Sequence, residues 1–312
     1  MASVEDKDSN EQLSFQVGSL RMKNPVMLAS GVIGSTFGLL PRIAEAGAGA
    51  MVTKSISLEP RSGYKNPTIV EVECGYINAV GLSNPGVEGF KEEIMALTAK
   101  PIPVIVSLFG SKPNDFETLI SKLESPLIDA YEINLSCPHV EKVGLEIGQD
   151  PVMVSAIVRS AKNCSSKPVF VKVSPNLANL VDVSLAAESG GADGITAINT
   201  VKAMTIDIET CRPVLSNRFG GLSGPAVKPI AVKCVYDIYS KVNIPIIGCG
   251  GISDWADAVE FILAGASAIQ IGSAVGSKGL DVFGDVVRGI QKYMFSHGFL
   301  KIGDMVGQAH SS

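Results

Sequence analysis

Three observations predict that this 312-residue chain is an α/β protein folded as a (β/α)8 TIM barrel with a short N-terminal β-hairpin. Short, nearly continuous apolar runs recur along the chain, segments with helical spacing of apolar residues lie between most of them, and many of the 32 glycines follow the apolar runs. Such runs are typical of parallel strands buried on both faces, and eight of them alternating with helices suit a closed barrel. An open doubly wound sheet is the alternative, because strand number alone does not exclude it.

The predicted barrel strands are eight runs rich in β-branched residues, at residues 26–29, 50–54, 103–108, 130–135, 168–173, 194–199, 244–250 and 268–272. The clearest helices between them are residues 150–163, 180–190, 228–242 and 255–265. Gly-Ala pairs end several helices, as a glycine cap at a helix C-terminus would. The N-terminal hairpin is predicted over residues 13–25, and we expect it to close the bottom of the barrel.

Composition and charge narrow the classes of function. The net charge is −5 with no block of Lys and Arg, so nucleic-acid binding has no electrostatic basis. No apolar stretch reaches the roughly 18 residues of a membrane span, and the polar N-terminus reads as neither an export nor a transit signal. We therefore expect a cytoplasmic protein with no nucleic-acid or membrane partner. No Pro- or Ser-rich linker divides the chain, which predicts a disordered tail over residues 1–12 and a single domain over residues 13–312.

The six cysteines are scattered, and their spacing matches no zinc or iron–sulfur site, so no metal is predicted. They are Cys74, Cys137, Cys164, Cys211, Cys234 and Cys249. Reduced thiols are favoured over disulfides in a cytoplasmic protein. We expect most of these residues to be small buried hydrophobes.

Polar side chains stand where the predicted strands end, which is where the active site of such a barrel lies. In chain order they are Ser30, Lys54, Ser107, Asn134 with Cys137, Lys172, and Asn199 with Thr200. Taken singly, each is most simply a residue that satisfies a loop. Two lysines at the ends of apolar strands are harder to explain in that way, because lysine is seldom buried without a partner.

The last two strands end in glycine-rich loops, Gly250-Gly251 and Gly272-Ser273. Barrels commonly bind phosphate with these two loops, because bare backbone N–H groups and a helix N-terminus face the anion. Ordinary turn glycine is the alternative. Neither a Walker loop nor a G-x-G-x-x-G motif is present, which favours a phosphorylated cofactor such as FMN over a nucleoside triphosphate or a dinucleotide. A lysine such as Lys172 would then stabilise the charge of reduced flavin.

Seven collinear segments share the pattern of one family. They are "NPVMLASG" (24–31), "NAVGLSNPG" (78–86), "EINLSCPHV" (132–140), "VKVSPN" (171–176), "AINT" (197–200), "GGLSGPAVKPIA" (220–231) and "IIGCGGI" (246–252). Together they resemble class 1 dihydroorotate dehydrogenase, most closely the class 1B-like catalytic subunit. The resemblance covers Phe15 to Met294, and it does not include the long amphipathic N-terminal extension of the membrane-bound class 2 enzymes.

The resemblance implies an FMN enzyme that oxidises (S)-dihydroorotate to orotate in pyrimidine biosynthesis. By motif, FMN would contact Ser30, Lys54, Ser55, Ser107, Asn134, Lys172, Ile198, Gly224, Gly250, Gly251, Gly272 and Ser273. The substrate would contact Lys54, Asn78, Ala79, Val80, Gly81, Leu82, Asn134, Asn199 and Thr200. The family also implies a homodimer and, for class 1B, a partner subunit with FAD and an iron–sulfur cluster. Whether NAD, fumarate or quinone is the final acceptor is not indicated by the sequence.

Cys137 would be the catalytic base. The substrate must lose a proton from C5 and a hydride from C6, and the proton needs a base on the face opposite the flavin. A thiol has an ordinary pKa of about 8.5, so it reaches its basic form more easily than a serine. The alternative, a buried structural thiol, is disfavoured by the position between Asn134 and Pro138. The family often has Asn where this chain has His139, so His139 must supply that hydrogen bond or the substrate differs. Ser107 also stands where relatives commonly have Asn.

Other functions stay open on the sequence alone. Residues 136–139 ("SCPH"), 148–151 and 197–209 also resemble the pyrimidine-reducing domain of dihydropyrimidine dehydrogenase, which uses the same barrel, FMN and cysteine on uracil or thymine. Lys54 and residues 78–86 favour orotate, because uracil has no carboxylate. A non-catalytic FMN or phosphate-binding barrel would need no base, and an isomerase or aldolase would use a lysine Schiff base. Residues 78–86 and 217–226 are expected to be mobile loops that cover the ligand, or else ordinary barrel loops.

Overall fold

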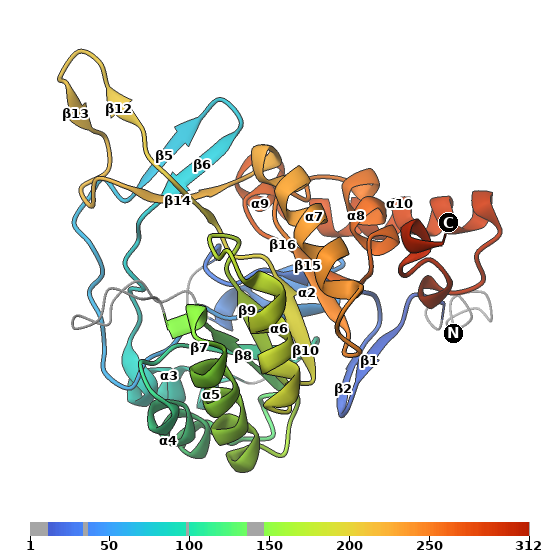
Figure 1. Cartoon of the computed structure of the whole chain (residues 1–312), viewed down its shortest axis with the longest axis horizontal. Coiled ribbons are helices and arrows are strands. Elements are labelled where there is room, and N and C mark those ends of the chain that lie inside the picture. The colour runs from blue at the N-terminus through green and yellow to red at the C-terminus, as the bar shows by residue number, and fades with distance from the viewer. Residues whose placement is uncertain (1–11, 34–36, 98–99, 136–146, 312) are drawn as a thin grey trace.

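The computed structural model describes residues 12–33, 37–97, 100–135 and 147–311. Its centre is a closed barrel of eight parallel strands that follow one another in chain order, and the last strand pairs with the first (Figure 1). The strands are β3 (Val26–Leu28), β4 (Ala50–Val52), β7 (Val104–Leu108), β8 (Ala130–Asn134), β9 (Val169–Val173), β10 (Gly194–Ala197), β15 (Ile246–Cys249) and β16 (Ala266–Ile271). The predicted barrel is confirmed, and the open doubly wound sheet is excluded.

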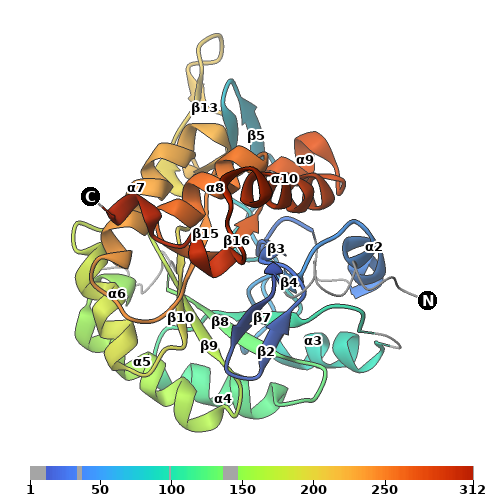
Figure 2. The ribbon, with the colours of Figure 1, turned by 90° about the vertical axis from the view of Figure 1, so that its right-hand side faces the viewer.

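Helices cover the outside of the barrel (Figures 1 and 2). They are α2 (Leu40–Glu45), α3 (Gly86–Met95), α4 (Pro113–Leu123), α5 (Pro151–Cys164), α6 (Leu180–Ser189), α7 (Lys228–Tyr239), α8 (Trp255–Leu263), α9 (Ala274–Lys278) and α10 (Val282–His297). The four helices expected from the sequence are α5, α6, α7 and α8. Helix α5 begins where the sequence has an N-cap residue followed by a proline. The Asp150 carboxylate accepts a hydrogen bond from Val152 N–H, and Pro151 opens the first turn.

The N-terminal hairpin closes the bottom of the barrel, as expected. Strands β1 (Phe15–Val17) and β2 (Leu20–Met22) pair antiparallel. They lie at the end of the molecule opposite the strands β5 and β13 (Figures 1 and 2). Phe15, Leu20 and Met22 are buried in one apolar cluster with inward-facing barrel residues. The barrel therefore has a dry lower end. The other members of this cluster are Met27, Ala50, Val52, Ile105, Ala130, Phe170, Ile247 and Ala268.

An antiparallel sheet rises from the opposite end, and the sequence did not predict it. The loops that follow β4 and β10 pair in the order β11-β14-β6-β5, and a small hairpin of β12 and β13 projects beyond them (Figure 1). These strands are β5 (Ile69–Val72), β6 (Gly75–Asn78), β11 (Val201–Ala203), β12 (Ile206–Asp207), β13 (Arg212–Pro213) and β14 (Gly220–Ser223). The expected loops over 78–86 and 217–226 are therefore partly sheet, because Asn78 pairs with Gly221.

The expectation that most cysteines are buried is wrong for the described residues. Cys249 is buried, Cys164 and Cys234 are half-buried, and Cys74 and Cys211 are exposed. All five are free thiols in the structure. Among the described residues, no group of three or more His, Cys, Asp or Glu side chains could hold a metal ion. Within the same residues, no helix combines the length and the apolar character needed to cross a membrane.

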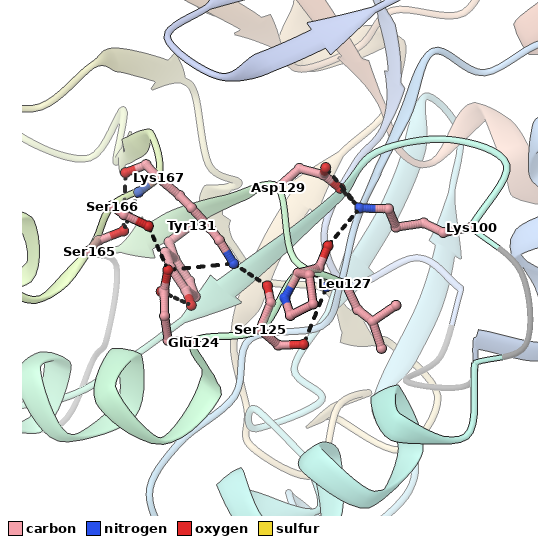
Figure 3. A network of polar contacts seen from close by, with 10 residues as sticks. Lys100, Glu124, Ser125, Leu127, Asp129, Tyr131, Ser165, Ser166 and Lys167 are labelled. Carbon is pink, nitrogen blue, oxygen red and sulfur yellow. Dashed lines mark hydrogen bonds and ion pairs between the residues drawn. The ribbon is translucent and has the colours of Figure 1, made fainter.

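A network of polar contacts ties the loops at the bottom of β8 and β9 (Figure 3). The Tyr131 hydroxyl donates to Glu124 Oε2 at 3.0 Å, and the Lys167 ammonium lies 3.6 Å from Glu124 Oε1 and donates to the Ser125 carbonyl. Nearby, Lys100 pairs with Asp129 at 2.8 Å. Burial, and then the Glu124 carboxylate, raise the pKa of the Tyr131 hydroxyl well above its usual range. This network therefore favours the protonated form of a buried tyrosine.

Tyr131→Phe is expected to lower the free energy of unfolding at neutral pH by about 1.5 kcal/mol, because a hydrogen bond to a charged acceptor is lost. Above about pH 10 the native protein keeps the Tyr131 proton while the unfolded chain releases it, so wild-type stability falls by about 1.4 kcal/mol per pH unit through this group. The difference in the free energy of unfolding between wild type and Tyr131→Phe should therefore shrink as the pH rises. Denaturant unfolding at neutral and alkaline pH measures it, with the exposed Tyr236→Phe as control.

Candidate active site

The interior of the barrel is layered from apolar at the bottom to polar at the mouth. Alternate residues of a strand point to the same side, so one strand contributes to successive levels. On β8, Ala130 belongs to the bottom apolar cluster, Glu132 follows it, and Asn134 ends the strand. On β9, Phe170 and Lys172 repeat this order. The polar mouth predicted from strand ends therefore rests on a second polar level inside the barrel.

We call that level the polar layer; it consists of Glu132, Lys172, Thr196 and Gln270. All four residues are buried, from 0% to 6% exposed. Glu132 Oε2 accepts hydrogen bonds from Gln270 Nε2 at 2.7 Å and from Thr196 Oγ1 at 2.9 Å. Lys172 Nζ donates to Gln270 Oε1 at 3.1 Å and lies 3.9 Å from Glu132 Oε1. The Gln270 amide thus bridges a buried carboxylate and a buried ammonium.

The electrostatics of this layer follow from its burial. Burial lowers the pKa of the Lys172 ammonium, but Cys249 and Glu132 more than offset this, and the pKa lies above its usual value. Burial raises the pKa of the Cys249 thiol, against the effect of Lys172. The carboxylate that faces the Lys172 ammonium is that of Glu132, whose Oε1 atom lies 3.9 Å away. The ammonium predicted to lie beneath the flavin is therefore charged.

Above the polar layer, amide and hydroxyl groups from four strand ends form one hydrogen-bonded series, the amide–hydroxyl chain. Asn199 Nδ2 donates to Asn134 Oδ1 at 3.2 Å, and Asn134 Nδ2 donates to Ser55 Oγ at 3.1 Å. Ser55 Oγ lies 2.9 Å from Ser107 Oγ. The backbone N–H of Thr200 donates to Asn199 Oδ1 at 2.8 Å, which fixes the orientation of that amide. Four predicted site residues and Thr200 are thus brought together.

The antiparallel sheet connects Asn78 to the same side of the mouth. Asn78 Nδ2 donates to the Gly221 carbonyl at 3.2 Å. A Cβ on Gly221 would lie 2.0 Å from Thr200 Oγ1, so the strand passes directly against Thr200. Two further predicted substrate residues use their backbone carbonyls in loop hydrogen bonds. The Val80 carbonyl accepts from Tyr64 N–H, and the Leu82 carbonyl accepts from Asn84.

Ser30 and Lys54 stand two residues after the ends of the first two barrel strands, β3 and β4. Ser30 Oγ donates to the Thr53 carbonyl at 2.7 Å, which ties the end of β3 to the end of β4. Lys54 follows Thr53 and is half-buried. In the described part of the chain, no ion pair involves its ammonium. Lys54 can therefore pair with an incoming anion without breaking an ion pair among these residues.

Glycine is required where the loop after β15 turns. Gly250 has φ 129° and Gly251 has φ 77°, conformations that other residues rarely adopt. A Cβ on Gly250 would lie 3.4 Å from Ile198 Cγ1, and a Cβ on Gly251 would lie 2.8 Å from the Gly224 carbonyl oxygen. The structure therefore gathers these four predicted cofactor residues into one close-packed turn.

The two glycine loops differ at the helices that follow them. The start of α8 is already capped, because the Asp254 carboxylate accepts from Ala256 N–H and Asp257 N–H. The start of α9 has no side-chain cap at Ser273. A phosphate in the predicted site would therefore use the Gly250-Gly251 turn and the Gly272-Ser273 loop, since Asp254 already accepts from two backbone N–H groups in the first turn of α8.

Asp257 holds the loop after β15 in place. Its Oδ2 accepts from Ser253 N–H and Ser253 Oγ, both at 2.8 Å, and its Oδ1 accepts from Lys228 Nζ at 2.8 Å. On the other side of the loop, Lys278 of α9 donates to the Ser253 carbonyl at 2.9 Å. The two glycine loops are therefore connected through Lys278.

Some predicted residues are not joined to this site. Ala79 packs with Ile77 and Leu215 in the small core of the antiparallel sheet. Cys137 and His139 lie outside the described residues, so their predicted roles stay predictions.

Sequence reasoning missed the polar layer apart from Lys172. A carboxylate in the apolar run 130–135 and an amide in the run 268–272 were the available signals, since Glu132 and Gln270 are polar residues inside buried strands. Asp257 was also missed, because its hydrogen bonds define a loop rather than a strand end.

Comparison with known proteins agrees with the fold and the motifs. The family model described as dihydroorotate dehydrogenase matches residues 12–294. Three similar proteins are named dihydroorotate dehydrogenase B (NAD(+)), catalytic subunit. The one from Pyrococcus furiosus is 52% identical over 95% of this chain and 98% of its own length. Those from Methanocella arvoryzae and Methanothermobacter thermautotrophicus are 48% and 47% identical, each over 96% of this chain and 98% of their length.

These matches do not favour the dihydropyrimidine dehydrogenase alternative or a non-catalytic barrel. The family match spans the whole barrel, including the polar strand ends and both glycine loops. The chain therefore belongs to the dihydroorotate dehydrogenase family, as an oxidoreductase of pyrimidine biosynthesis.

Proposed function

We propose that this chain is a class 1B catalytic subunit that oxidises (S)-dihydroorotate to orotate on FMN held over the mouth of the barrel. The observation that carries the proposal is that the buried Lys172 is the register partner of Asn134, a member of the amide–hydroxyl chain, on the neighbouring barrel strand. A flavin ring presents acceptors along one edge, and a pyrimidine presents alternating donors and acceptors. Both are satisfied by an ammonium and by side-chain amides.

The residues present fit FMN at both ends. At the phosphate end, a Cβ on Gly251 would lie 2.7 Å from the Lys228 backbone nitrogen, so only glycine fits this turn. In the described residues, no hydrogen bond occupies the backbone N–H groups of Gly251, Gly272 and Ser273. At the ring end, Lys172 supplies a positive charge, with Ser55, Ser107 and Asn134 beside it. Ser30, Ile198, Gly224 and Gly250 complete the proposed contacts.

The chain's own groups divide the chemistry between binding and proton transfer. Lys54 pairs with the substrate carboxylate, while Asn78, Asn134, Asn199 and Thr200 hold the pyrimidine ring. When bound, FMN supplies the acceptor for the hydride from C6. Cys137 takes the proton from C5 on the opposite face of the substrate.

A partner subunit completes this proposal. The similar proteins are named as catalytic subunits of NAD(+)-linked enzymes. We therefore propose that electrons leave the flavin through a partner that carries FAD and an iron–sulfur cluster. A homodimer of this chain, a cytoplasmic location and one domain over residues 13–312 belong to the same proposal.

Purified protein tests the function directly. We expect a yellow protein that releases FMN on denaturation, and dihydroorotate should bleach its flavin while dihydrouracil does not. Co-expression with the partner should be needed for NAD reduction, and fumarate and quinone serve as alternative acceptors. A colourless protein that binds no added FMN would contradict the proposal.

Cys137→Ala is expected to retain FMN and orotate binding but to lose turnover at neutral pH by about 10²-fold or more, which is the usual contribution of a positioned base. Stopped-flow reduction of the flavin by dihydroorotate measures this loss. The exposed Cys74→Ala is the matched control and should turn over normally. Near-normal flavin reduction in Cys137→Ala would remove this thiol from the mechanism.

Asp257→Asn is expected to weaken FMN binding by about tenfold, because an amide cannot accept from Ser253 and Lys228 with both of its ends. Titration of the apoprotein with FMN, followed by quenching of flavin fluorescence, gives the dissociation constant. Glu260→Gln is the control, since Glu260 also pairs with Lys228, at 2.9 Å, but is not bonded to Ser253. Equal weakening in both variants would mean that Lys228, and not the loop, is responsible.

A further inference from the structure

Glu132 is a fully buried carboxylate that the proposed chemistry does not use. Its side chain is 1% exposed, and its Oε2 atom accepts the two hydrogen bonds from Gln270 and Thr196. Its Oε1 atom is buried and, among the described residues, accepts no hydrogen bond. The nearest cation is the Lys172 ammonium at 3.9 Å. An under-satisfied buried acceptor of this kind needs an explanation beyond packing.

The arrangement makes sense as support for Lys172. An ammonium buried without a counter-ion costs several kcal/mol and tends to lose its proton. The Gln270 amide is oriented at both ends, because Nε2 donates to Glu132 and Oε1 accepts from Lys172. Turning this amide over would place its N–H groups against the ammonium. The bridge therefore fixes the position of the lysine as well as its charge.

We propose that Glu132 is a positioning residue for the flavin: together with the Gln270 bridge, it is the counter-ion that keeps Lys172 protonated and directed at the mouth of the barrel. This inference rests on the FMN site proposed above. Glu132 acts only through Lys172, whose positive charge stabilises reduced FMN more than oxidised FMN. It thus adjusts the reduction potential from inside the barrel without touching the cofactor.

Among the described residues, the titratable groups that act on Lys172 are Glu132 on β8 and Cys249 on β15. Thr196 on β10 and Gln270 on β16 contact the pair but do not titrate. Cys249 is the alternative counter-ion, as a thiolate. Burial disfavours that form, and Glu132 adds a negative charge nearby. If Glu132 is the counter-ion, replacing Glu132 should shift the potential and replacing Cys249 should not. If Cys249 is the counter-ion, the reverse should hold.

The experiment measures the potential of bound FMN in the holoprotein by dye-coupled reduction at about pH 7 and about pH 9, below the ordinary pKa of lysine. In Glu132→Gln at the higher pH, the preference for reduced over oxidised FMN should fall at least tenfold. This corresponds to a change of the reduction potential by about −30 mV for a two-electron couple. Lys172→Met should show a similar shift at both pH values. Cys249→Ala, the matched control, should leave the potential unchanged.

The double variant decides whether Glu132 acts through Lys172. In a Lys172→Met background, Glu132→Gln should change the potential no further, because the charge that it supports is gone. An equal shift with and without Lys172, no shift at either pH, or a shift only in Cys249→Ala would overturn the inference.

Folding and cofactor binding are checked separately. If Glu132→Gln does not fold, Gln270→Met removes the bridge while keeping both charges, and it should shift the potential in the same direction by a smaller amount; an unchanged potential would overturn the inference. Wild-type protein that binds no FMN would instead refute the proposed function. These two failures are distinguishable from the absorption spectrum of the wild type alone.

Discussion

Closure of the parallel ladder is the constraint on which the site depends. Each strand pairs with the next in the chain and the last pairs with the first, so every C-terminal strand end faces one mouth. Glu132 and Gln270 are 138 residues apart in the chain, yet their side chains meet inside the barrel at 2.7 Å. No local segment could hold such a pair in water. The barrel supplies the low-dielectric interior in which one carboxylate and one amide can set the charge state of a lysine.

The apolar bottom makes this polar interior tolerable. Phe15, Leu20 and Met22 of the hairpin seal the lower end against inward-facing barrel residues, so water cannot reach the polar layer from below. Replacing the charged pair by hydrophobic residues of similar size would often be neutral or stabilising. That a buried pair is present directly beneath the predicted flavin site therefore points to chemistry rather than to stability. The network around Tyr131, near the start of β8, connects the loops at the bottom of the barrel.

The sequence predicted what depends on local pattern and missed what depends on pairing. All eight barrel strands were found because β-branched runs bounded by glycine are strong local signals. The mouth residues followed, because they end those strands. Glu132 and Gln270 were missed because a strand buried on both faces has no alternation that marks its inward residues. The antiparallel sheet was missed because its strands are short and glycine-rich. Gly75, for example, is required by the close approach of the Ser223 carbonyl, and Ser223 lies 148 residues further along the chain (223 − 75).

The amide–hydroxyl chain shows how such a site can be selective before any ligand arrives. The Thr200 N–H requires an oxygen opposite it, so Asn199 turns its Nδ2 toward Asn134, and Asn134 in turn offers its Nδ2 to Ser55. The amides are thereby fixed in one orientation by backbone rather than by the ligand. A pyrimidine whose donors and acceptors match this order exchanges hydrogen bonds without reorganising the side chains. One with the reverse order leaves buried polar groups unpaired, which is the larger penalty.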